Sequence, residues 1–251
     1  MKWLRRLLWT AAALAVLAAA ALGGLWWWLT HPTADVKPLP AGLLALDSPE
    51  GQALLAGAAR ADHAALAAAW QAQEQRAWCG VASAVTTLAA LRGMSMRQAE
   101  LFTAEAEAVR SRWVVTFTGM PLADLAGLLR AHGVEAAAHH ADEGLAAFRA
   151  ALRRNLATPG DYLIVNWRRD GLGQEGLGHH SPVSAYDAAG DRVLILDVDA
   201  HLYPPAWAPV ERLFAAMDTV DGDGGERRDW VEVSPARASA PDRPIGVRSD
   251  P

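Results

Sequence analysis

Residues 73–93, QEQRAWCGVASAVTTLAALRG, decide the fold, because they join the only cysteine of the 251-residue chain to a helical pattern. Apolar residues recur between positions 81 and 91 at helical spacing, and Gly93 is a helix stop signal. Cys79 is therefore predicted at or just before a helix N-terminus. Unpaired backbone N–H groups and the helix macrodipole favour an anion there, which lowers a thiol pKa and produces a nucleophilic thiolate.

A lone cysteine is more often a small buried apolar side chain than a nucleophile. Cysteine-based catalysis also needs an imidazole to move the proton, a group that orients the imidazole, and donors for the oxyanion. A catalytic role for Cys79 therefore depends on such partners elsewhere in the chain.

Composition sets limits on the class of protein. An apolar fraction of 52% is ample for a large core. A net charge of −5 offers no basic surface for nucleic acid, so nucleic acid is not expected as a partner. A single cysteine forms no internal disulfide, so an oxidising compartment leaves Cys79 free.

The N-terminal 30 residues are predicted to form a membrane anchor. Residues 7–29 carry no charge, Lys2, Arg5 and Arg6 precede them, and the tryptophans at 26–28 are typical of an interfacial belt. This length and belt favour an uncleaved signal anchor over a cleaved signal. The domain is thus expected on the extracytoplasmic side, membrane-anchored or secreted.

The rest of the chain divides into a proline-rich linker at 31–42, a catalytic domain at 43–236 and a polar, disordered tail at 237–251. Helices precede most strands, which predicts an α+β fold with a helical N-terminal part and an antiparallel C-terminal sheet. The expected helices are 48–69 (with Ser48 as N-cap), the helix after Cys79, 95–107, 121–132 and 142–156. Strands are expected at 162–167, 181–186 and 193–198, with an edge strand at 230–233 and a short strand or connecting piece at 113–117.

The predicted hairpin supplies partners for the cysteine. Its turn centres near Ala188, so that His179 and Asp197 face each other and form a candidate imidazole–carboxylate pair. His180 would point to the opposite face, and a slip of one residue in the register would exchange the two histidines, so this pattern leaves both open. Gln73 is a candidate oxyanion donor beside the Cys79 backbone N–H.

A metal site is the rival interpretation of the same region. Asp197, Asp199 and His201 alternate along the sequence and could share one face with His179 around a divalent ion. Cys79 would then take no part in the chemistry.

Five stretches carry a resemblance to a known family: LDSPEGQALL, QEQRAWCGVASAVTTLAAL, GHHSPVSAYDAAGDRVLILDV, YPPAWAPVERLFAAMDTVD and GERRDW. In this order, from about residue 43 to 233, they resemble the catalytic domain of phytochelatin synthase, a papain-like cysteine transpeptidase. The resemblance implies a papain-like fold whose helical part carries the nucleophile.

The resemblance also implies roles for particular residues. Cys79 matches the nucleophile, Gln73 the oxyanion-hole glutamine, and His179 the histidine of the family's Gly-His-x-Ser-Pro motif, which selects it over His180. Asp197 matches the aspartate that follows the Leu-Ile-Leu strand. Asp221 and Arg228 match residues that bind the γ-glutamyl end of the substrate, where a carboxylate suits an ammonium group and a guanidinium suits a carboxylate.

The implied reaction is attack on the Cys-Gly amide of glutathione to leave a γ-glutamylcysteinyl thioester. A second glutathione as acceptor gives phytochelatin, and water gives γ-glutamylcysteine. Three departures favour hydrolysis: His180 replaces an aromatic residue, Ser184-Ala185 replaces Gly-Gly, and Ala200 stands near a place where plant members carry arginine.

No bound cofactor or protein-held metal is expected, and Cd²⁺ or Zn²⁺ would enter as a thiolate complex of the substrate in a response to heavy metals. A homodimer is one option for the assembly. The alternatives are a cysteine peptidase for another small peptide, the metal-dependent hydrolase, and an exported protein that sequesters thiols or metal, which a single cysteine disfavours.

Overall fold

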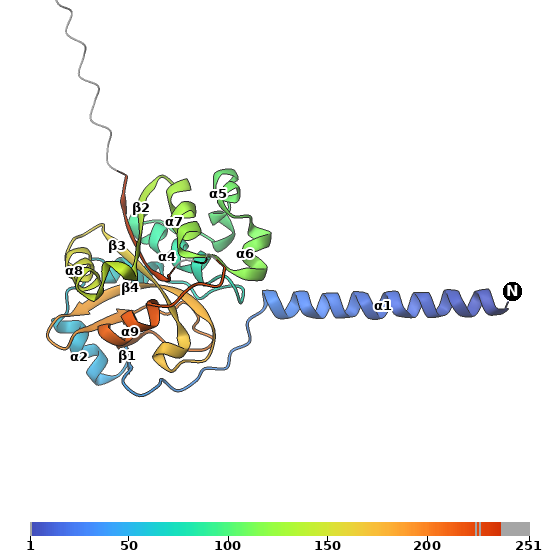
Figure 1. Ribbon diagram of the computed structural model, residues 1–251, viewed down its shortest axis with the longest axis horizontal. Coiled ribbons are helices and arrows are strands. Elements are labelled where there is room, and N and C mark those ends of the chain that lie inside the picture. Colours follow the sequence, from blue (N-terminus) through green and yellow to red (C-terminus); the bar gives the residue numbers. More distant parts are fainter. Residues whose placement is uncertain (1, 224, 226, 237–251) are drawn as a thin grey trace, which may run out of the picture.

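The computed structural model describes residues 2–223, 225 and 227–236, so the predicted tail at 237–251 lies outside the described residues. Its N-terminal helix α1 (Lys2–Thr30) projects from the folded domain (Figure 1) and buries none of its residues. By length and composition α1 is able to cross a membrane. The segment 31–42 has no regular structure and lies along the domain, where Asp35 and Lys37 donate backbone hydrogen bonds of 2.8 Å to the carbonyls of His201 and Leu202.

The domain is built on one antiparallel sheet of seven strands in the order β1-β6-β5-β4-β3-β7-β2. The strands are β1 (Leu44–Ala45), β2 (Val134–His140), β3 (Tyr162–Arg168), β4 (Gly178–Asp187), β5 (Arg192–Ile195), β6 (Ala206–Pro209) and β7 (Asp229–Pro235).

Helices cover both faces of this sheet (Figure 1). One core lies under α2 (Pro49–Gly57), α3 (His63–Ala69), α4 (Cys79–Arg92), α5 (Ala104–Val109), α6 (Arg112–Thr118) and α7 (Leu122–Ala131). The second core lies under α8 (Leu145–Asn155) and α9 (Val210–Met217). Short 3₁₀ turns occupy Gln98–Leu101, Ala141–Glu143 and Arg169–Leu172.

The central strand β3 is buried on both sides, which explains its nearly continuous apolar sequence. Successive side chains of a strand point to opposite faces. Tyr162 and Ile164 accordingly join the core under α4 and α7, whereas Leu163, Val165 and Trp167 join the core under α8 and α9. The α+β class is confirmed, but helices and strands are less segregated than predicted, because α8 and α9 belong to the C-terminal part.

The helix after the cysteine forms as predicted. It begins at Cys79 and ends at Arg92, and Gly93 caps it in the left-handed conformation with φ +63°, which glycine adopts without steric cost. Val81, Val85 and Leu88 are fully buried against the sheet. The helix is therefore a rigid element of the core that holds the cysteine at its exposed end.

Three predictions in the helical part of the chain need correction. Residues 113–117 are neither strand nor connector but lie in α6, which Ser111 caps by accepting a hydrogen bond from the Val114 N–H. The predicted helix at 48–69 is two helices, because Ala59 pairs with Tyr186 of the sheet and interrupts it. The predicted helix at 95–107 is a 3₁₀ turn followed by α5, which starts at the cap Thr103.

Two strand predictions are also corrected. The strand at 230–233 is not at an edge, since β7 pairs with β3 on one side and β2 on the other. In the hairpin, Asp187 pairs with Arg192 and Val183 pairs with Ile195. A turn centred near Ala188 predicts partners two to three residues earlier in the chain, so the predicted register is wrong. The cause is the position of the turn, which centres between Ala189 and Gly190 instead of near Ala188, and a bulge between Val183 and Ala185 then shifts the pairing by one residue.

Candidate active site

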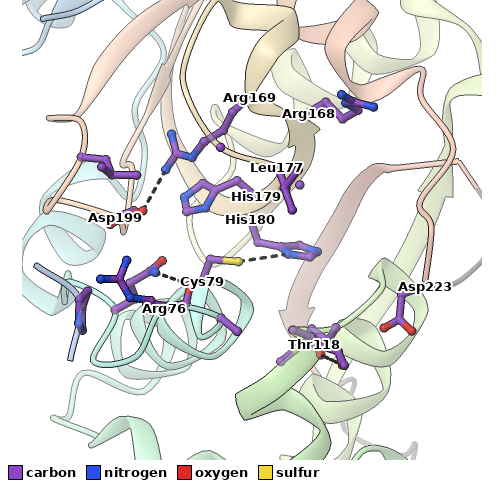
Figure 2. Close-up of a pocket in the computed structure, with 18 of the residues that line it drawn as sticks. Arg76, Cys79, Thr118, Arg168, Arg169, Leu177, His179, His180, Asp199 and Asp223 are labelled. Atoms are coloured by element: carbon purple, nitrogen blue, oxygen red, sulfur yellow. Dashed lines mark hydrogen bonds and ion pairs between the residues drawn. The ribbon is translucent and has the colours of Figure 1, made fainter. Parts of the chain in front are cut away.

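Cys79 lies at the wall of a cleft of about 680 Å³ (Figure 2), where it begins α4 and is half-buried. The cleft also contacts the start of β4, the end of α6 and the loop that follows α9. The first N–H groups of a helix have no partner within the helix and favour an anion beside them. The position of Cys79 thus suits a thiolate.

Two histidines approach the sulfur from the first residues of β4. The Nδ1 atom of His180 lies 3.8 Å from the Cys79 Sγ, and Figure 2 shows the ring of His179 beside it, on the side of Arg169. Ser83, one turn along α4, donates a hydrogen bond of 3.0 Å to the His180 carbonyl and so fixes this strand to the nucleophile helix.

His179 is paired with Asp197. The His179 Nε2 lies 2.8 Å from the Asp197 Oδ1, and the Ser181 hydroxyl is 3.2 Å from the same nitrogen. Trp167 packs edge-on against the imidazole at 5.0 Å. With Nε2 bonded to the carboxylate, Nδ1 is the ring nitrogen left to interact with Cys79. The two residues are brought together although the predicted register was wrong, because Asp197 lies beyond the end of β5.

Arg169 holds the aspartate and was missed by the sequence analysis. Its guanidinium bonds both oxygens of Asp197, at 2.9 and 3.0 Å, and lies 3.7 Å from Asp199 and 3.1 Å from the Gln174 Oε1. Arg169 is only 2% exposed. Nothing in the local sequence distinguishes it from the neighbouring Arg168, so only the packing reveals its place.

These charges shift the pKa values in the direction that thiolate chemistry requires. Burial alone raises the pKa of Cys79, but hydrogen bonds and charges of His179, then of His180, lower it well below its ordinary value. Burial and Arg169 lower the pKa of His179, but Asp197 outweighs them and raises it to about 9. Burial raises the pKa of Asp197, but Arg169 and His179 hold it below its usual range. A thiolate–imidazolium pair is therefore stable near neutral pH.

Gln73 is buried and lines the cleft close to Cys79. Its Nε2 donates one hydrogen bond of 2.9 Å to the Arg76 carbonyl, and its Oε1 has no hydrogen-bond partner among the described residues. One N–H of the amide remains to serve an oxyanion. The role predicted for Gln73 thus remains a proposal.

Asp221 and Arg228 meet in the same cleft. The Arg228 Nη1 donates to the Asp221 Oδ2 at 3.0 Å and lies 3.3 Å from the Asn166 Oδ1. Gly178 makes room for this pair, because a Cβ there would lie 1.9 Å from the Arg228 Nη1. This explains in physical terms why glycine precedes the two histidines. Sequence reasoning missed Asn166, which carries no motif.

The metal site considered from the sequence does not form. Among the described residues, no group of three His, Cys, Asp or Glu side chains is arranged to hold a metal ion. Asp197 is occupied by Arg169 and His179, and a guanidinium beside Asp197 and Asp199 repels a cation.

The fold and the cleft define an α+β protein in which a histidine paired with an aspartate lies beside the single cysteine at the wall of a cleft. These are the groups that cysteine-dependent acyl transfer requires in general. The family model for phytochelatin synthase matches residues 34–230, and the chain belongs to this family.

Curated relatives agree with this assignment. The chain is 37% identical over 117 residues to glutathione gamma-glutamylcysteinyltransferase 3 of Lotus japonicus, which covers 46% of this chain and 24% of the relative. It is 29% identical over 171 residues to glutathione gamma-glutamylcysteinyltransferase 1 of Arabidopsis thaliana, and this match covers 66% of this chain and 35% of the relative. It is also 32% identical over 85 residues to glutathione gamma-glutamylcysteinyltransferase of Schizosaccharomyces pombe, and this match covers 34% of this chain and 19% of the relative. The chain thus spans about a fifth to a third of the length of these relatives.

Removal of the Arg169 guanidinium should destabilise the protein much more than removal of its neighbour. Arg169→Ala removes one of the two cationic partners of the buried Asp197 carboxylate and leaves only His179 beside it, which costs about 3–5 kcal/mol. Arg168→Ala breaks an exposed pair with Asp170, worth less than about 1 kcal/mol. Urea unfolding of the detergent-solubilised chain, followed by tryptophan fluorescence, measures both. Equal effects of the two substitutions would contradict the anchoring role of Arg169.

The Cys79 thiolate should persist below the pH at which an ordinary cysteine protonates, about 8.5. Because the pKa is lowered, the rate of alkylation by iodoacetamide should stay near its plateau through neutral pH. His180→Phe keeps a ring but removes one hydrogen-bond partner, so the profile should move to higher pH, and His179→Ala should move it further. Mass spectrometry follows the single cysteine directly. An unchanged profile in His180→Phe would show that its 3.8 Å contact has no effect on the thiol.

Proposed function

We propose that this protein is a glutathione γ-glutamylcysteinyltransferase with a papain-like catalytic domain, in which hydrolysis to γ-glutamylcysteine is prominent. One observation carries the proposal: the Cys79–His179–Asp197 alignment shares its cleft with the Asp221–Arg228 pair. The first can perform acyl transfer, and the second can bind the two charges of an amino-acid end.

In the first step the Cys79 thiolate attacks the carbonyl carbon of the Cys-Gly amide. The developing oxyanion is stabilised by the backbone N–H at the start of α4 and by the amide of Gln73. His179, protonated with a pKa of about 9, gives its proton to the nitrogen of the departing glycine. Asp197 stabilises the imidazolium in its orientation throughout. A γ-glutamylcysteinyl thioester on Cys79 results.

Substrate recognition is assigned to Asp221 and Arg228. The γ-glutamyl group ends in an ammonium and a carboxylate on the same carbon. The Asp221 carboxylate can bind the ammonium, and the Arg228 guanidinium can bind the carboxylate in a bidentate manner. Before substrate binds, the 3.0 Å hydrogen bond between Arg228 and Asp221 holds both charged groups in the cleft. The ammonium and carboxylate of the substrate would then replace this bond.

In the second step neutral His179 removes a proton from water, the hydroxyl oxygen attacks the thioester carbonyl, and the Cys79 thiolate leaves. Attack by the amino group of a second glutathione instead would extend the peptide. Hydrolysis is favoured by Ala200, which offers no charge to an acceptor, and by His180, a polar group at the sulfur. Cd²⁺ or Zn²⁺ enters in this scheme as a thiolate complex of glutathione.

Helix α1 supplies the proposed location. None of its residues is buried, and its apolar sequence runs to three tryptophans near its C-terminal end, as expected for a signal anchor. With Lys2, Arg5 and Arg6 on the cytoplasmic side, the domain lies on the extracytoplasmic side.

Mass spectrometry of the full chain in detergent with glutathione tests the reaction. We expect release of glycine and γ-glutamylcysteine, with a thioester adduct on Cys79, and no turnover in Cys79→Ser. Oligomers of γ-glutamylcysteine ending in glycine, formed with Cd²⁺, would instead identify a synthase. Glutathione returned intact, with no adduct on Cys79, would refute the proposed substrate.

Arg228→Lys should raise KM for glutathione roughly tenfold with little change in kcat, because a bidentate charged hydrogen bond is worth about 1.5–3 kcal/mol. The matched control is Arg227→Lys, whose side chain is exposed and pairs with Asp218. Steady-state kinetics of both variants measure the difference. If the two substitutions had equal effects on KM, Arg228 would not bind the substrate.

A further inference from the structure

An exposed apolar surface adjoins the end of α1. In α6, Trp113 is 64% and Phe117 52% exposed, and Val114 is exposed beside them. Leu177, in the loop before β4, is 80% exposed. Phe117 and Leu177 line the same cleft. We call Trp113, Val114, Phe117 and Leu177 the apolar rim. A cluster of large exposed apolar side chains marks an interaction surface more often than a solvated one.

A row of aromatic rings connects the rim to α1. Trp26 of α1 packs on Trp113 with ring centroids 5.7 Å apart, and Trp113 stacks on Phe117 at 6.4 Å. Figure 1 shows α6 on the side of the domain from which α1 departs. The apolar rim is therefore continuous with the surface of α1 rather than separate from it.

This continuity fixes the depth of the rim. Trp26 lies in the last turns of α1, at the level where tryptophans occupy the boundary between acyl chains and headgroups. That boundary region is several ångströms thick on each side of the hydrocarbon core. With α1 across a bilayer, Trp113, whose ring centroid is 5.7 Å from that of Trp26, would lie in this region or directly beside it.

The opposite wall of the cleft is also attached to α1. Arg76, in the loop between Gln73 and Cys79, donates a hydrogen bond of 2.6 Å to the Trp28 carbonyl and places its guanidinium 4.5 Å from the Trp28 ring centroid. Trp28 itself lines the cleft. The end of α1 thus contacts the domain at two points, which restricts how the domain tilts relative to the helix.

We propose that the apolar rim rests in the headgroup region of the bilayer that α1 crosses, so that the cleft opens along the membrane surface. The occupant of this surface is lipid, because α1 brings the bilayer to it and the rim offers the aromatic and aliphatic groups that suit the interface. This inference rests on the anchoring role proposed for α1. It does not depend on the substrate of Cys79.

Site-specific quenching in nanodiscs tests the proposal. In a Cys79→Ser background, single cysteines are introduced at Phe117, Leu177, Leu14 and Ala53 of the full chain and labelled with an environment-sensitive fluorophore. Leu14 reports on α1. Ala53 is an exposed position on α2, which Figure 1 shows on the side of the domain away from α1, and serves as the matched control. The nanodiscs contain phosphatidylcholine with or without a lipid that carries a nitroxide near its glycerol backbone or in its acyl chain.

We expect the shallow nitroxide to remove most of the emission at positions 117 and 177, the deep nitroxide to quench position 14, and neither to affect position 53. The label at 177 lies in a loop, so it reports on docking even if Phe117→Cys impairs folding of α6. Quenching at position 14 alone would refute the contact of the apolar rim with lipid but support the membrane anchor formed by α1. Shielding of 117 from water without lipid quenching would assign the rim to a protein partner or a second copy, and also overturn it. No quenching at any position would refute the membrane anchor as well. The proposed reaction with glutathione is tested separately by mass spectrometry and does not depend on this result.

Discussion

The buried ion pair between Arg169 and Asp197 is the interaction on which the site depends. Arg169 follows β3 and Asp197 follows β5, so the pair joins the ends of two strands that β4 separates. A carboxylate this deeply buried would take up a proton without its cation, and a neutral acid could not stabilise an imidazolium. The guanidinium thus lowers the pKa of Asp197, Asp197 raises the pKa of His179, and His179 together with His180 lowers the pKa of the Cys79 thiol.

The two ends of the cleft differ in character. Near Cys79 and Arg228 the groups are charged or strongly polar, and each has a partner that holds it in place. At the mouth, Trp28, Phe117 and Leu177 expose apolar surface. Glutathione carries its charges at the γ-glutamyl and glycyl ends, so the polar end suits its recognition, whereas the apolar mouth has no evident role in binding so polar a molecule. Contact with the bilayer, as proposed above, would give that mouth a role.

The sequence predicted those features that depend on local pattern. Helical spacing and Gly93 were enough to place α4 and its cysteine, because the helix is buried by a regular stripe and ended by a residue with a special conformation. The register predicted for His179 and Asp197 was wrong, since the position of the turn and the bulge between Val183 and Ala185 have no clear signal in the sequence.

Other features depend on tertiary packing and were out of reach. The sequence WVVTF at 113–117 has the composition of a strand, but the cap at Ser111 and its contacts with the core make it a helix. The alanine-rich β2 lacks strand signals and forms because β7 offers it an edge. Arg168 and Arg169 are adjacent and alike in sequence, yet one is solvated and the other is buried in the site. Only the three-dimensional neighbours of each residue separate them.

The place of β7 in the sheet has a consequence for biogenesis. Strands β2 and β3 are both made before β7, yet β7 lies between them, so β2 has no neighbour and β3 keeps one open edge until the last strand arrives. Arg228, directly before β7, completes the cleft at the same moment. A chain that is synthesised or translocated from its N-terminus therefore carries its thiol outside the completed cleft until β7 has emerged. Maturation of the site is thus coupled to the arrival of β7, and the open edges of β2 and β3 are where a chain interrupted before β7 would aggregate.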